Sequence, residues 1–166
     1  MDTKRLYPLF GLPLIAFNIS AIAIEDIKMY PGALCQPKTN AQSIVRNARG
    51  ALLNTGNGPQ IWTCPIVRDR PGTIEGAVIV VSNSDATADV SCTLFSRMPT
   101  GQLVASETQA TTGTGVFNLE YGSGDPNIDS QEGDGHYYFI CTVPGKFGEL
   151  RSGVIGYRVT ENFGET

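Results

Sequence analysis

The sequence has very little of what enzymes most often use for nucleophilic, acid–base or metal chemistry. Histidine occurs once, as His136, so a histidine-rich zinc site is excluded and a Ser-His-Asp or Cys-His arrangement would have to use this residue. There is no Gly-x-Ser-x-Gly elbow, phosphate-binding loop or dinucleotide fingerprint. We interpret His136 as a solvated turn residue at the start of a strand. These absences predict a protein that is not an enzyme and has no cofactor.

Basic residues are also few. The chain has 12 lysines and arginines against 16 aspartates and glutamates, for a formal net charge of −4. Nucleic-acid binding depends on basic patches that neutralise phosphates. We therefore expect no nucleic-acid partner.

Residues 1–23 have the pattern of a secretory signal peptide. Lys4 and Arg5 form a basic start, an apolar run follows, and Ala21-Ile22-Ala23 supplies small residues for signal peptidase. The alternative is a membrane anchor, but prolines, a glycine and an asparagine interrupt a run that barely reaches the ~20 apolar residues of a spanning helix. We expect residues 24–166 to form a single secreted or periplasmic domain with no stable membrane span after cleavage.

The four cysteines all follow this segment, at Cys35, Cys64, Cys92 and Cys141. An even number of cysteines in an exported chain predicts disulfides. The sequence contains no Cys-x-x-Cys pair, so a zinc site or a thioredoxin-like redox site is poorly supported. Three connectivities are possible. We prefer Cys35–Cys64 and Cys92–Cys141, because the first two flank irregular chain and the last two lie within apolar strand-like runs.

Short β-like segments with turn residues between them fill most of the chain. Residues 24–40 are interpreted as an irregular arm pinned by Cys35, with an edge strand at residues 33–36 as the alternative. No long helical pattern is present. About eight strands are expected, at residues 43–53, 60–64, 74–82, 90–96, 102–108, 116–121, 136–143 and 153–161. The predicted fold class is all-β, an antiparallel β-sandwich of the jelly-roll or Ig-like kind, stabilised by disulfides. A closed barrel is the alternative.

Three segments carry a resemblance to known proteins. They are Thr63-Cys64-Pro65-Ile66-Val67-Arg68-Asp69, Val90-Ser91-Cys92-Thr93-Leu94 and Tyr137-Tyr138-Phe139-Ile140-Cys141-Thr142-Val143-Pro144. The chain resembles a widespread group of uncharacterised exported bacterial β-domain proteins with Cys-Pro-x-Val-Arg-Asp and Ser-Cys-Thr-Leu segments. The resemblance implies a small exported β domain with paired cysteines, and it implies no activity.

Two polar segments are candidate sites. Asp125, Asn127 and Asp129 match the first, third and fifth positions of a calcium loop, but Ser130 and His136 occupy positions where that loop needs glycine and glutamate. We favour a solvated loop there. The run Arg68-Asp69-Arg70 could face a ligand, and we favour an ion-paired turn.

Carboxylates and aromatic side chains offer two further kinds of site. A glycosidase needs two facing acids, and five acids lie scattered at predicted strand ends and turns: Glu75, Asp85, Asp89, Glu107 and Glu120. Aromatic residues could form a sugar-stacking platform, and the candidates are Trp62, Tyr121, Tyr137, Tyr138 and Tyr157. Because strands alternate, Tyr137 and Tyr138 face opposite ways, which leaves too few exposed aromatics to predict a platform.

These observations favour a secreted, non-catalytic binding module or envelope-associated structural module that acts on an extracellular partner. Carbohydrate is the leading ligand class. The competing hypothesis is an extracellular polysaccharide-directed hydrolase that uses two loop carboxylates. Self-association through an exposed sheet edge is a third.

Overall fold

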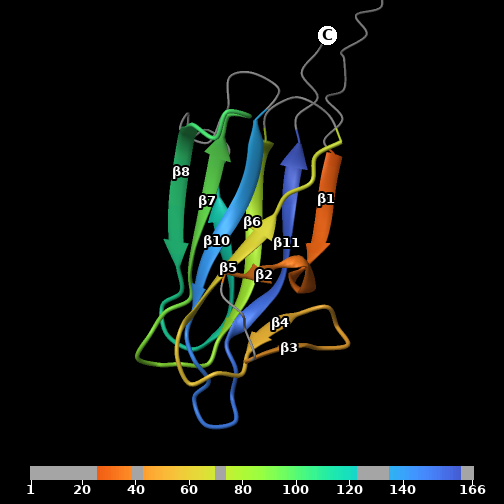
Figure 1. Cartoon of the computed structure of the whole chain (residues 1–166). Helices are drawn as coiled ribbons and strands as arrows, with labels where there is room; N and C mark the ends of the chain where they lie inside the picture. The colour runs from red at the N-terminus through yellow and green to blue at the C-terminus, as the bar shows by residue number, and fades with distance from the viewer. Residues whose placement is uncertain (1–25, 39–42, 70–73, 123–134, 162–166) are drawn as a thin grey trace, which may run out of the picture.

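The computed structural model describes residues 26–38, 43–69, 74–122 and 135–161. Within these residues the chain forms two antiparallel β-sheets packed face to face, with a single 3-10 turn, η1 (Gly32–Leu34) (Figure 1). The predicted disulfide-bonded β-sandwich is therefore confirmed. No helix in this part of the chain is long and apolar enough to cross a membrane. The expected signal peptide and the calcium-loop candidates Asp125, Asn127 and Asp129 lie outside the described residues.

The six-stranded sheet has the strand order β3-β4-β11-β6-β9, and β1 also pairs with β11. Its strands are β1 (Asp26–Pro31), β3 (Ile44–Arg46), β4 (Leu52–Asn54), β6 (Ile74–Asn83), β9 (Gly115–Tyr121) and β11 (Gly153–Glu161). The five-stranded sheet has the order β2-β5-β10-β7-β8. Its strands are β2 (Gln36–Pro37), β5 (Gln60–Pro65), β7 (Ser91–Arg97), β8 (Leu103–Ala110) and β10 (His136–Val143).

The connections between strands follow a jelly roll. From β4 to β11 the chain changes sheet at every step except the β7–β8 hairpin. This order places β4-β11-β6-β9 in one layer and β5-β10-β7-β8 in the other, which is the double Greek key of a jelly roll. Strands β5–β11 correspond to seven of the eight segments that the sequence predicted, and the remaining segment, residues 43–53, spans β3 and most of β4. Figure 1 shows the two layers and the connections at their ends.

The N-terminal part departs from the prediction of an irregular arm. Residues Asp26–Pro31 pair along their whole length with β11, and β3 and β4 form a small hairpin where a single bent strand was expected. Strand β1 was missed because its alternation is unusual: Lys28 and Tyr30 are partly buried, whereas Ile27 and Met29 are exposed. The sheet therefore has an additional edge strand.

Alternation along the longer strands produces the core between the two sheets. In β7 and β10 every second side chain is buried, which directs Leu94 and Phe139 inward and Phe95 and Tyr138 outward. The largest side chains in the interior come from both sheets: Trp62, Tyr121, Tyr137, Phe139, Leu52, Ile79 and Leu94. Burial of this apolar surface is the main stabilising contribution in a domain of this size.

Two disulfides join the pairs that the sequence analysis preferred. Cys92 lies directly opposite Cys141 across β7 and β10, so this bond links neighbouring strands at the centre of one sheet. The Cys35–Cys64 bond attaches the chain after η1 to β5 of the five-stranded sheet. Close packing fixes η1 as well, because a Cβ on Gly32 would lie 2.1 Å from the carbonyl oxygen of Val154.

Candidate functional site

A group of aromatic rings lies on the outer face of the five-stranded sheet, the face directed away from the other sheet. Phe95 on β7 is directly opposite Tyr138 on β10, and their nearly parallel rings have centroids 5.4 Å apart at an interplanar angle of 17°. His136 precedes Tyr138 on the same side of β10, with centroids 6.1 Å apart at 18°. Phe95 and Tyr138 are half-buried and His136 is exposed. The three rings therefore form a contiguous group across two neighbouring strands of the sheet.

Arg97 completes this group, which we call the aromatic–arginine cluster (Phe95, Arg97, His136 and Tyr138). The guanidinium carbon of Arg97 is 5.8 Å from the centroid of the Phe95 ring, within the range of a cation–π contact. Its Nε donates a hydrogen bond to the Tyr138 hydroxyl at 2.5 Å, and Nη1 donates to the carbonyl oxygen of Gly101 at 2.7 Å. These contacts fix the guanidinium and occupy two of its five N–H donors.

Hydroxyl side chains cover much of the remaining outer face. Thr63, Thr93 and Thr108 lie in one row across the sheet, separated only by Ile140, and the hydroxyls of Thr93 and Thr108 are 2.8 Å apart. The neighbouring rows add Ser91, Ser106 and Thr142. A hydroxyl can both donate and accept hydrogen bonds. The face thus combines apolar rings with groups that can exchange hydrogen bonds with a polyhydroxylated ligand.

The five strands of this sheet contain a single carboxylate, Glu107 on β8. Glu107 is opposite the buried Leu94, so it lies on the inward side of the strand, where it accepts a hydrogen bond from Gln109. The outward positions of the five strands therefore carry no negative charge.

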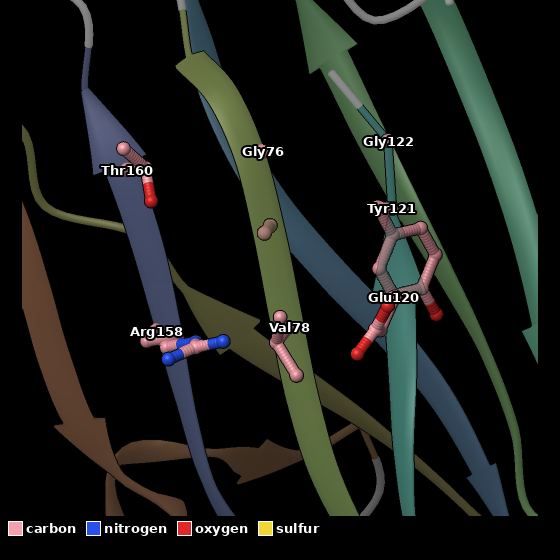
Figure 2. Close-up of a pocket in the computed structure, with 8 residues that line it drawn as sticks. Gly76, Val78, Glu120, Tyr121, Gly122, Arg158 and Thr160 are labelled. Atoms are coloured by element: carbon pink, nitrogen blue, oxygen red, sulfur yellow. The ribbon is translucent and has the colours of Figure 1, made fainter.

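A shallow polar hollow lies on the opposite side of the molecule, on the outer face of the six-stranded sheet (Figure 2). It has a volume of about 220 Å³. Arg158 on β11 and Glu120 on β9 flank Val78 on β6, with Gly76 and Thr160 beyond. Because these strands run side by side, the two charged groups are separated by the width of β6.

Among the described residues that line it, the hollow has neither two facing acids nor an exposed aromatic ring. Glu120 is the one carboxylate among its lining residues. Tyr121 contributes to the lining but is only 2% exposed, and its hydroxyl donates a hydrogen bond to the carbonyl oxygen of Cys92 in the core. Burial raises the pKa of the Tyr121 hydroxyl, so it remains protonated. This arrangement suits neither the two-acid chemistry of a glycosidase nor ring stacking.

The segment Arg68-Asp69 is ion-paired, as the sequence analysis favoured. Asp69 accepts a hydrogen bond from Lys28 of β1 at 2.5 Å, and Asp26 accepts a second one. The two hydrogen bonds raise the pKa of the Lys28 amine. Arg68 lies 5.2 Å from the Tyr137 ring centroid and pairs with Glu161 at 3.7 Å. These contacts attach the loop after β5 to β1 and β11. Arg70 lies outside the described residues.

The other acidic residues considered from sequence occupy separate places. Asp85 accepts hydrogen bonds from the backbone and side chain of Thr87, and these lower the pKa of its carboxyl group. Asp89 accepts a hydrogen bond from the Thr111 hydroxyl. Glu75 belongs to β6. Among the described residues, no three His, Cys, Asp or Glu side chains are grouped so that they could hold a metal ion.

Four of the five aromatic candidates belong to the core. Each is at most 3% exposed: Trp62, Tyr121, Tyr137 and Tyr157. The prediction that Tyr137 and Tyr138 face opposite ways is confirmed, and Tyr138 is the outward one. Sequence reasoning missed Phe95 and Arg97, although inward Cys92 and Leu94 imply by alternation that both point outward. Their proximity to Tyr138 depends on strand register, which the sequence did not provide.

The sequence matches no protein-family model and no curated protein at a significant level. The fold is similar to that of the CBM36-1 domain of a multidomain xylanase from the hindgut metagenome of Trinervitermes trinervoides. That match has a TM-score of 0.51 and 10% sequence identity, and it covers 85% of this chain and 99% of the domain.

Two further structures align less well. A family two carbohydrate esterase from Cellvibrio japonicus gives a TM-score of 0.49 at 7% identity, over 86% of this chain and 36% of the esterase. The xylan-binding module CBM15 gives 0.44 at 8% identity, over 84% of this chain and 97% of the module.

Proposed function

We propose that the protein is a non-catalytic carbohydrate-binding module whose ligand lies on the outer face of the five-stranded sheet. The observation that carries the proposal is the aromatic–arginine cluster, a contiguous group of rings beside rows of hydroxyl groups. Stacking on an aromatic ring provides apolar contact for a sugar, and the surrounding polar groups fix its orientation through hydrogen bonds. The rigid strands hold these side chains in place before a ligand arrives.

The fold supports the same function. The CBM36-1 domain is a carbohydrate-binding module, and its fold is similar to that of this chain along almost the whole domain. Fold alone does not determine function. The outer-face side chains therefore carry the argument and the fold is consistent with it.

Export is part of the proposal. Two disulfides suit an oxidising compartment, and residues 1–23 have the composition of a secretory signal. We assign the protein to the periplasm or the extracellular space, where polysaccharides are available as ligands. The hydrolase hypothesis has less support, because the described lining of the hollow supplies one carboxylate, Glu120, where two are needed.

A glycan array tests this function. The protein, exported to an oxidising compartment and purified with both disulfides formed, should bind at least one class of polysaccharide. Phe95→Ala and Tyr138→Ala should each weaken that binding roughly 10-fold or more, the scale of losing a central aromatic contact. Phe147→Ala is the matched control, because Phe147 is 58% exposed in the loop after β10 and lies off the sheet. Absence of binding to any polysaccharide, or equal loss in all three variants, would contradict the proposal.

A further inference from the structure

We infer that the saccharide recognised by the outer face of the five-stranded sheet is anionic, carrying a uronate carboxylate or a sulfate ester. This inference rests on the proposed function and specifies its ligand. Its basis is one fixed cation, Arg97, beside the contacting rings of a sheet whose five described strands carry no outward carboxylate.

The charge distribution between the two sheets supports this ligand class. The whole chain has an excess of acids, with a net charge of −4. Acidic and basic side chains both occur on the strands of the six-stranded sheet, as with Glu120 and Arg158 beside the hollow. The outward positions of the five-stranded sheet instead combine Arg97 with no aspartate or glutamate. An anion that approaches these five strands therefore meets the charge of Arg97 and no outward carboxylate on the strands themselves.

Arg97 has no carboxylate partner within the part of the chain that the structure describes. The three ion pairs found there involve Lys28 and Arg68. Arg97 is held instead by two uncharged oxygens, the Tyr138 hydroxyl and the Gly101 carbonyl. Its charge is thus positioned but not neutralised, and three N–H donors are left for a ligand.

The geometry of the cluster suits an acidic sugar. Guanidinium is planar and matches the paired oxygens of a carboxylate or sulfate, which lysine does not. The Tyr138 hydroxyl accepts its hydrogen bond from Arg97, so its own proton can be donated to the ligand. A sugar ring against Phe95 or Tyr138 would bring its anionic substituent beside the guanidinium, because Arg97 contacts the Phe95 ring and the Tyr138 hydroxyl.

Titration calorimetry with matched polysaccharides tests the inference. One arm compares polygalacturonate with its methyl ester, and the other compares dextran sulfate with dextran. In one arm the charged member should bind roughly 10- to 100-fold more tightly than its neutral partner, the range expected for hydrogen bonds to a charged group. The arm that shows the preference distinguishes a carboxylate ligand from a sulfate ligand. Rising salt should reduce the preference, because the face is exposed.

Variants at Arg97 locate the effect. Arg97→Gln should abolish the preference for the charged member, and Arg97→Lys should retain only part of it because the planar fork is lost. Arg158→Gln is the matched control on the other sheet and should leave the preference intact. An unchanged thermal midpoint would show that each variant is folded.

The possible results separate the inference from the proposed function. If neutral and charged members bind equally, or if a neutral polysaccharide on the array binds and no charged one does, the inference is overturned and the binding function stands. If the preference survives in Arg97→Gln, the assignment to Arg97 is wrong. If no polysaccharide on the array or in either arm binds, the proposed function itself is overturned.

Discussion

At the scale of single residues, Glu161 is the one acidic or basic side chain, among those that the structure describes, that is almost completely buried. Glu161 is 3% exposed at the end of β11, near Arg68 and Lys28. Burial raises the pKa of its carboxyl group above the usual 4.5, and the nearby positive charges offset only part of that effect. The folded protein therefore holds a proton at this site at pH values where the unfolded chain has released it.

This shift predicts a pH-dependent difference between wild type and Glu161→Gln. Because the folded state binds the proton more tightly, the contribution of Glu161 to stability is complete below pH 4.5 and declines as pH rises through the raised pKa. The glutamine variant lacks this decline. Urea unfolding across this range should show the variant gaining stability relative to wild type as pH increases. A trend of opposite sign in Glu161→Gln would contradict the assignment.

Residue type alone could not separate core aromatics from surface aromatics. Trp62 and Tyr121 were candidates for a platform because of their chemistry, yet both fill the interior. Tyr121 can do so because its hydroxyl finds a buried partner in the Cys92 carbonyl. Phe95, the most apolar type, lies on the outer face. Successive side chains in a strand point to opposite faces, so burial depends on which face a position occupies. Because Cys92 and Leu94 point inward, Phe95 could have been assigned to the outer face from the sequence.

At the scale of elements, β1 is held by its pairing with β11 and by contacts of its two partly buried side chains, Lys28 and Tyr30. The Tyr30 ring stacks on Tyr157 with centroids 5.0 Å apart, and its hydroxyl donates a hydrogen bond to the carbonyl oxygen of Val67. Lys28 pairs with Asp69 in the same loop. These contacts explain why the sequence predicted an irregular arm: the partners are distant in sequence, and hydrophobic periodicity does not report them.

Removing one of these contacts should loosen β1 selectively. Tyr30→Phe keeps the stacked ring and loses the hydrogen bond to Val67, so the free energy of unfolding should fall by about 1 kcal/mol. Amide hydrogen exchange should accelerate in Asp26–Pro31 and stay unchanged in β10 at the centre of the other sheet. Tyr138→Phe provides a comparison at an outward tyrosine. Uniform acceleration in every strand would show that β1 does not open independently.

The β-sandwich was largely predictable, since the strands β5–β11 match predicted segments with turn residues between them. The sequence left the jelly-roll and Ig-like kinds open, and the strand order decided between them. Register was not predictable in the same way. The aromatic–arginine cluster exists because Phe95 is opposite Tyr138, and Cys92 is opposite Cys141 in the same register. A shift by one residue would turn every outward side chain inward. The candidate site therefore required the structure.

At the scale of the whole molecule, the two disulfides close loops with sequence separations of 29 and 49 residues. In the loop-entropy model each contributes roughly 3–4 kcal/mol, compared with a net stability of ~5–15 kcal/mol for a typical domain. Reduction should therefore lower the thermal midpoint substantially. Scanning calorimetry with and without reductant measures the change, and a midpoint that does not move would show that the disulfides add little. Replacing Cys35 and Cys64 together by alanine should remove about half of the effect.

The two faces of the sandwich differ in chemistry, and this difference is the central claim about function. One face has rings, hydroxyls and a fixed arginine, and the other has a shallow hollow between Arg158 and Glu120. The most direct comparison of the two faces is an NMR titration, in which a polysaccharide that the protein binds is added to isotope-labelled protein. Amide and side-chain signals of Phe95, Arg97 and Tyr138 should shift, whereas those of Glu120 and Arg158 should not. Shifts confined to the hollow would contradict the account.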